Sequence, residues 1–147
     1  MDLVSSMIET HPNRPGRGDV SLLRNVIVAA YECAQICTSC ADACLSERDV
    51  DRLSACIRLD LDCAEICVVT GSLLSRIGLA GEELLRAQLR ACQLACAACE
   101  TECAKHGKVH EHCAICAQAC RLCREACTRL LEMNPRPHGS AETSVTH

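Results

Sequence analysis

Large aromatic side chains are almost absent from this sequence. Its 147 residues include no Trp, no Phe and a single Tyr, Tyr31. A domain of this size can bury a sizeable core, but the bulky side chains that fill ordinary cores are missing. The interior must therefore be built from smaller side chains.

Other absences narrow the class of protein. No stretch approaches the ~18 apolar residues of a membrane span, and residues 1–19 lack the regions of a secretory signal peptide. The 15 Lys and Arg residues are scattered among 19 Asp and Glu residues, so no basic patch suggests nucleic-acid binding. No Ser-His-Asp, Cys-His or paired-carboxylate arrangement forms a catalytic site. We therefore expect a cytoplasmic protein that is not an enzyme.

Cysteine takes the place of the missing aromatics. The chain has 16 cysteines, roughly 11% of its residues, above the ~8–10% that marks a cysteine-specified protein. Cysteine-dense chains are usually small secreted disulfide scaffolds. A helix-forming chain of this length without a signal peptide instead favours a reducing cytosol with free or metal-bound thiols. An oxidised scaffold is the alternative.

Helix-breaking residues divide the chain into three parts. Residues 1–18 predict a short amphipathic helix followed by a Pro- and Gly-rich linker, and residues 134–147 predict a disordered polar tail. Residues 19–133 hold the four long helical segments. These segments run from 19 or 21 to about 46, from 49 to about 71 with an extension to 77, from 82 to 106, and from about 109 to 133. Short connections predict an all-α fold, an antiparallel up-down-up-down four-helix bundle.

The cysteines recur at helical spacing in all four segments. The first and third segments share the pattern C-x3-C-x2-C-x3-C, an internal repeat. At about 100° per residue, the cysteines of a segment share one narrow face, the a and d positions that line a bundle axis. The predicted thiol lining consists of Cys33, Cys37, Cys40, Cys44, Cys56, Cys63, Cys67, Cys92, Cys96, Cys99, Cys103, Cys113, Cys116, Cys120, Cys123 and Cys127. We expect these thiols to point at one another and to bind metal.

Charge indicates which metal suits this lining. Soft thiolates select Cu(I), Zn(II) or iron–sulfur clusters. Sixteen thiolates bridged by about sixteen Cu(I) ions are neutral, whereas tetrahedral zinc at four thiolates each would leave about −8 in the core, and buried charge is costly. The sequence therefore predicts bulk storage of Cu(I).

Other interpretations of the cysteines remain open at this point. The run Cys37-x2-Cys40-x3-Cys44 is superficially similar to a ferredoxin motif, but it lacks the second x2 step and the proline. An iron–sulfur electron carrier, a zinc-thiolate buffer and a thiol redox switch are the alternatives. A purely structural core of small hydrophobic cysteines is the simplest one.

The two ends of the thiol lining differ. The up-down order brings the turns 46–49 and 107–109 to one end, where His106 and His110 continue the lining and His112 is adjacent. We predict that these histidines form a copper-binding mouth, with a solvated turn as the alternative. Asp60 replaces a cysteine of the repeat, either as a hydrogen-bonded core carboxylate or as a copper site. At the other end the lining continues in aliphatic residues, Val26, Ala30, Leu74, Leu85, Leu89 and Leu130.

The cysteine-lined helices and the turn CAKHGKVHEHC at residues 103–113 resemble the cytosolic branch of the bacterial copper storage proteins. The resemblance spans residues 19–133. It implies a homotetramer of four-helix bundles, each filled with Cu(I). A copper chaperone is a candidate partner. A second apolar stripe at Ile57, Leu61, Ala64 and Val68 predicts either a subunit interface or cover by the N-terminal helix.

Overall fold

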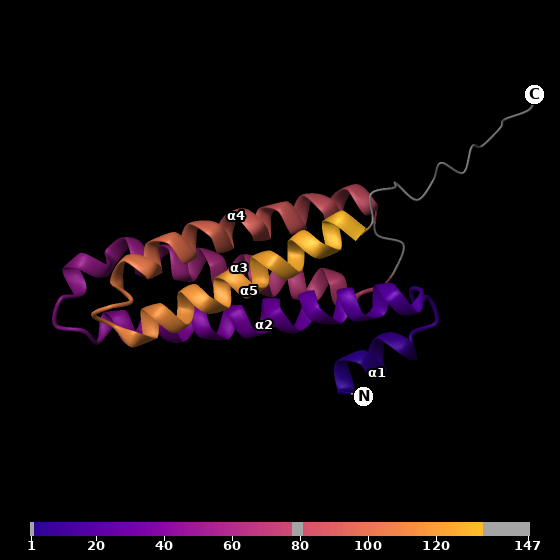
Figure 1. Cartoon of the computed structure of the whole chain (residues 1–147), viewed down its shortest axis with the longest axis horizontal. Coiled ribbons are helices and arrows are strands. Elements are labelled where there is room, and N and C mark those ends of the chain that lie inside the picture. Colours follow the sequence, from indigo (N-terminus) through magenta and orange to yellow (C-terminus); the bar gives the residue numbers. More distant parts are fainter. Residues whose placement is uncertain (1, 78–80, 134–147) are drawn as a thin grey trace, which may run out of the picture.

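The computed structural model describes residues 2–77 and 81–133, which are mostly helical. Its elements are α1 (Leu3–Glu9), α2 (Arg17–Leu45), the 3-10 helix η1 (Val50–Leu53), α3 (Ser54–Ser75), α4 (Glu82–His106) and α5 (Glu111–Met133). Figure 1 shows α2 to α5 lying side by side along the long axis. Both α2 and α4 pack against α3 and α5, so the four helices enclose a common axis. The predicted all-α four-helix bundle is confirmed.

Several helix ends differ from the sequence-based prediction. Helix α2 begins at Arg17, before the expected 19 or 21, and its N-cap Gly16 makes no side-chain cap. The expected helix start at Asp49 is wrong because Val50–Leu53 forms a 3-10 turn first. The expected start near 109 is also wrong, because α5 begins at Glu111. The His110 carbonyl accepts the first backbone hydrogen bonds of this helix, from the amides of Cys113 and Ala114. The boundaries of α4 are confirmed, and the expected tail, 134–147, lies outside the described residues.

The directions of the helices place the connections at two opposite ends. The α2–α3 and α4–α5 connections meet at the left of Figure 1, and the start of α2 lies at the right. We call the left end the mouth and the right end the closed end. Helix α1 packs against α2 and buries Ile8 there.

The single aromatic residue, Tyr31, fixes a close approach of α2 to α3. A Cβ atom added to Gly71 would lie 2.8 Å from the Tyr31 ring, so a larger residue there would push the helices apart. The Tyr31 hydroxyl also pairs with Ser72 Oγ at 3.1 Å. Glycine at position 71 therefore serves packing, although glycine lowers helix propensity.

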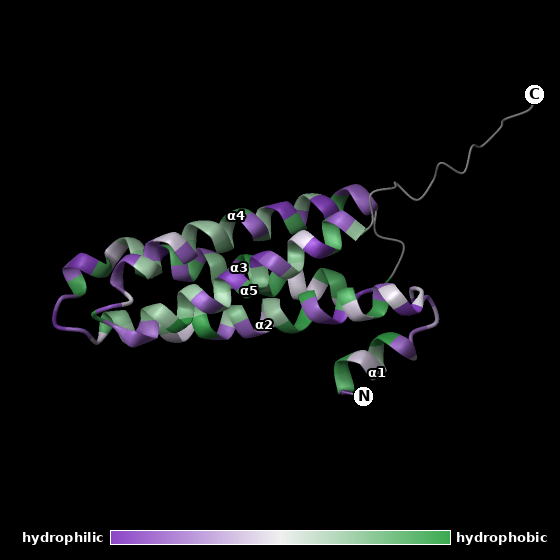
Figure 2. Ribbon diagram, viewed as in Figure 1, coloured by the Kyte–Doolittle hydropathy of each residue, from purple (hydrophilic) through white to green (hydrophobic). Residues whose placement is uncertain are grey.

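Hydrophobic and hydrophilic residues alternate around each long helix (Figure 2). By length and composition alone, α2 could cross a membrane, with a mean hydropathy of 1.2 over its most apolar window. Core helices of globular bundles pass the same test. Much of the hydropathy of α2 comes from cysteines and alanines that face α3 and α5 and are buried there.

Candidate metal centre

The sixteen cysteines form the core of the bundle. All are free thiols, and all have an exposed fraction of 0% except Cys40, at 2%. They come from all four long helices, because the a and d spacing turns each cysteine face toward the axis. The structure therefore has the predicted lining of inward-facing thiols.

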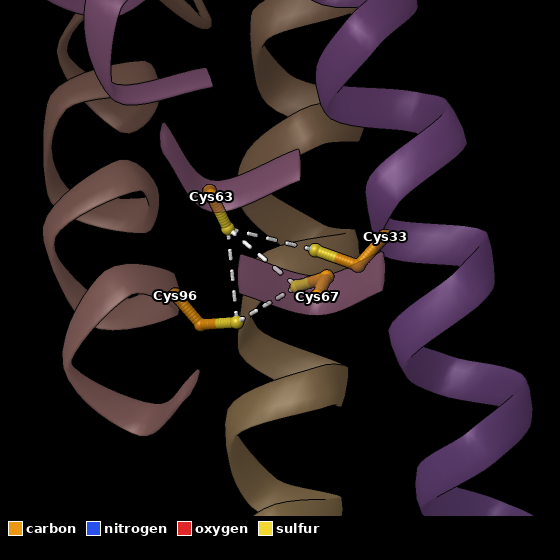
Figure 3. Close-up of side chains that lie close together, drawn as sticks. All are labelled: Cys33, Cys63, Cys67 and Cys96. Atoms are coloured by element: carbon orange, nitrogen blue, oxygen red, sulfur yellow. Dashed lines mark hydrogen bonds between the residues drawn. The ribbon is translucent and has the colours of Figure 1, made fainter. Parts of the chain in front are cut away.

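The sulfur atoms contact one another along the length of the bundle. Figure 3 shows one group, in which the Cys63 and Cys96 sulfurs lie 3.8 Å apart and Cys67 lies 3.8 Å from Cys96. Cys33 reaches this group from α2, 4.0 Å from Cys63. Similar contacts continue toward the mouth through Cys120, which lies 3.7 Å from Cys37. The thiols thus make a continuous column rather than isolated sites.

Within the column, thiols gather into overlapping groups of four. The ligand atoms of each group lie within 4.8 Å of one another. Neighbouring groups share members: Cys37 and Cys120 belong both to a group with Cys33 and Cys63 and to one nearer the mouth. Shared thiols suit bridging between several soft ions, because one thiolate can serve two Cu(I) ions.

Asp60 lies inside the column, with no exposed surface. Its Oδ1 accepts hydrogen bonds from the thiols of Cys99 and Cys116, both at 3.1 Å, and from Cys103 at 3.4 Å. Burial raises the pKa of the Asp60 carboxyl to about 8. These bonds fit the hydrogen-bonded core carboxylate that the sequence offers, and the copper-site alternative stays a prediction. Asp60 is the one buried carboxyl among the described residues.

Burial also affects the thiols themselves. It raises the pKa of the Cys44 thiol to about 11, and it raises the pKa of Cys113 further. Hydrogen bonding with Cys103 lowers the pKa of Cys56 instead. Because metal binds the thiolate, filling the column must release protons.

The three histidines at the mouth have different partners. His112 Nδ1 lies 3.4 Å from Cys40 Sγ and 3.6 Å from Cys113 Sγ, so this imidazole touches the thiol column. His110 is held between two carboxylates, with Nδ1 2.9 Å from Glu47 and Nε2 3.0 Å from Asp49. The hydrogen bond to Asp49 raises the pKa of His110.

The helical spacing of the cysteines predicts that the three histidines lie at the mouth, but it does not predict which of them contacts the thiols. His110 precedes α5 instead of continuing its cysteine face, and His106 pairs with Glu102 at 3.3 Å. His112, which the sequence places off register, lies against the thiols and stacks on His110 with 5.5 Å between ring centroids. The sequence pattern does not single out Glu47, although it places the turn that carries this residue at the same end of the bundle.

The closed end is aliphatic, as predicted. Val26 and Ala30 have no exposed surface, and Leu74 and Leu89 are 6% and 4% exposed. Leu74 and Leu89 also line an apolar pocket of about 350 Å³, and no described cysteine contributes to its lining. An ion at this end would meet no soft ligand before the buried thiols.

Known proteins share this architecture. The copper storage protein Ccsp of Streptomyces lividans, loaded with 10 copper equivalents, is 46% identical, covers 88% of this chain and 98% of its own, and has a TM-score of 0.85. The Cu(I)-bound copper storage protein BsCsp3 of Bacillus subtilis is 36% identical, over 71% of this chain and 93% of that one, with a TM-score of 0.64. The cysteine-rich protein YhjQ of Bacillus subtilis is 38% identical over 101 residues, 69% of this chain and 88% of that protein.

A family comparison agrees with these likenesses. The model of the copper storage protein family matches residues 20–132, nearly the whole four-helix bundle. The matched region contains every cysteine, Asp60 and the three mouth histidines. This chain belongs to the copper storage protein family.

Proposed function

We propose that this protein stores many Cu(I) ions along its thiol column, bound by the sixteen cysteines. The observation that carries the proposal is the column of buried free thiols that fills the bundle. Sulfur contacts run from Cys67 and Cys92 near the closed end to Cys37 and Cys116, and Asp60 joins Cys116 to Cys103. Cys40, Cys44 and Cys113 form the last group, at the mouth. One bridging Cu(I) per thiolate leaves this interior neutral. Tetrahedral zinc would leave about half of the thiolate charge uncompensated in the core.

The mouth supplies the route for the ions. His112 contacts the outermost thiols, so its imidazole can hold an incoming ion beside Cys40 and Cys113 before a thiolate takes it. His106 and His110 complete the mouth, and Asp60 adds an oxygen ligand deeper in the column. Delivery by a copper chaperone at this end fits the geometry, since the described lining of the closed-end pocket offers no soft ligand.

The assembly that we propose is a homotetramer. The second apolar stripe on α3 stays partly exposed, with Leu61 at 47% and Val68 at 45%. Because α1 packs against α2, the N-terminal helix leaves this stripe available to another subunit. Light scattering should give four times the chain mass of 15.9 kDa. A Leu61→Glu variant should dissociate, whereas Leu94→Glu, at an exposed position on α4, should not; an unchanged mass for Leu61→Glu would contradict this interface.

The store operates in the cytosol and has no catalytic role of its own in this proposal. The similar Streptomyces lividans protein is described as a cytosolic copper storage protein. Among the described residues the column consists of thiols and the Asp60 carboxyl, and in this proposal copper ions are its cargo. Reduced cysteines are the form that a cytosolic compartment maintains.

Anaerobic titration of the reduced full-length chain with Cu(I), in competition with a Cu(I) chelator, tests the proposed function. We expect saturation near one Cu(I) per cysteine, about 16 per chain. A parallel Zn(II) titration is the control and should saturate at about four ions or fewer. Saturation with Cu(I) at four ions or fewer would overturn the bulk-store proposal in favour of isolated sites.

A further inference from the structure

The type of donor atom changes sharply at the mouth. The rim offers imidazole nitrogens and carboxylate oxygens, with His110 between Glu47 and Asp49 and with His112 3.5 Å from Glu47. Nitrogen and oxygen donors of this kind suit Cu(II), whereas thiolates select Cu(I). An ion that passes from the rim to the column therefore meets a boundary between sites suited to two oxidation states.

One thiol pair near this boundary is unusually close. Cys56, in the first turn of α3, and Cys103, near the end of α4, have sulfurs 3.1 Å apart. The other sulfur–sulfur contacts of the described core are at least 3.6 Å, the shortest being Cys116 with Cys37. A disulfide bond is ~2.05 Å long, so this pair needs the smallest movement to become linked.

The pair also lies next to the thiols that the rim contacts. Cys56 begins α3 and Cys103 ends α4 at the mouth, where Cys40 of α2 and Cys113 of α5 are the two thiols beside His112. Electrons can thus pass from the pair through neighbouring sulfurs to an ion held at the rim. No thiol pair at the closed end has nitrogen donors beside it among the described residues.

We propose that the mouth reduces Cu(II) to Cu(I), with the Cys56–Cys103 thiol pair as the reductant. The two thiols lose two protons and two electrons and form one disulfide bond. Each of two Cu(II) ions at the rim gains one electron and moves as Cu(I) to the remaining thiolates. A cytosolic dithiol reductant then restores the pair by thiol–disulfide exchange. This activity rests on the proposed storage function, because the column supplies the acceptor for the product.

Anaerobic addition of two equivalents of glycine-chelated Cu(II) to the reduced full-length protein tests this proposal. The Cu(II) signal in electron paramagnetic resonance should disappear, and the thiol count of the denatured, metal-stripped protein should fall by two from 16. Peptide mapping after alkylation should find a single disulfide, between Cys56 and Cys103. A disulfide at another pair, or one spread over many pairs, would overturn the assignment.

Matched variants separate this activity from storage. Cys56→Ser should lose the fast phase of Cu(II) reduction, whereas Ala55→Ser, at the exposed neighbouring position in the first turn of α3, should keep it. Equal rates in the two variants would overturn the proposal. Titration of both variants with Cu(I) is the separate readout. Cys56→Ser should lose only about one Cu(I) of its capacity, and this result supports the storage function whatever the rate of Cu(II) reduction is. Peptide mapping of the unmodified protein decides the assignment of the pair however the variants fold.

Discussion

At the mouth, His112 touches two thiols and two carboxylates hold His110, whereas at the closed end the same four helices bring together Val26, Leu74 and Leu89. Both ends continue one helical face, so backbone geometry does not distinguish them. In the proposed store, a few side chains beyond the last cysteine decide which end admits ions. The two ends of the bundle therefore differ chemically, and we expect copper exchange at the mouth and a contribution to stability at the closed end.

The largest expected effect is on stability at the closed end. Leu89→Ala should lower the free energy of unfolding of the metal-free protein by about 2–5 kcal/mol, because it empties a buried site. Its Cu(I) capacity should stay unchanged, since no ligand is lost. Urea unfolding under reducing conditions measures the first quantity, and Leu84→Ala, at an exposed position on the same helix, is the control. A parallel fall in capacity would show that the closed end also takes part in binding.

The next effect concerns Asp60, deep between the two ends. Its folded-state pKa of about 8 lies above that of an unfolded aspartate, so the folded protein holds a proton that the unfolded chain has lost. Stability of the metal-free protein should therefore fall as pH rises from about 4 to about 8. One unit of pKa shift is worth about 1.4 kcal/mol, and the loss should exceed this amount.

Asp60→Asn is the comparison for that pH dependence. The variant cannot ionise at this position, so its urea midpoint should change less between pH 5 and pH 9 than that of the unmodified protein. Equal slopes in the two proteins would mean that Asp60 is already ionised at neutral pH and that the thiol hydrogen bonds outweigh its burial.

A smaller effect is expected at the mouth. Replacing His106, His110 and His112 by alanine should slow Cu(I) loading and removal severalfold while leaving nearly all the capacity, because the cysteines remain. Since His112 alone touches thiols, His112→Ala should account for most of the change and His106→Ala for little. Stopped-flow loading measures both rates. Unchanged rates in the triple variant would place copper exchange elsewhere.

The smallest expected effect is the pH dependence of copper loading, through protonation of His110 at the rim. The hydrogen bond to Asp49 raises the pKa of His110, so His110 should remain a cation to a higher pH than an ordinary histidine. Loading should therefore be slower on the acid side of this pKa, where the rim carries an added positive charge. Asp49→Asn should lower the pKa of His110, as NMR titration of the imidazole can measure. An unchanged pKa of His110 would show that Asp49 does not affect the protonation of this imidazole.

The sequence predicts the core of this molecule better than its ends. Cysteine spacing determines which face of each helix is buried, so the column follows from helical periodicity alone. The turns are set by capping and local hydrogen bonds, which periodicity does not contain. The 3-10 turn before Ser54 and the cap at His110 therefore shift two helix starts from their expected positions.

The same limit explains the mouth. Extrapolating the helix from Cys113 places His110 in the lining, but His110 lies before α5 and turns to Glu47 and Asp49. The same extrapolation places His112 off the cysteine face, yet this residue contacts Cys40 on another helix. Contacts between turns that are far apart in sequence depend on how the helices meet, and a one-dimensional pattern does not contain them.

Anomalous diffraction at the copper edge, from crystals of the fully Cu(I)-loaded protein, tests the central claim most directly. We predict a row of copper sites along the whole column, from Cys113 and His112 at the mouth to Cys67, Cys92 and Cys127 near the closed end. The aliphatic residues beyond should hold none. Copper confined to the mouth, with the inner thiols free, would contradict storage along the column.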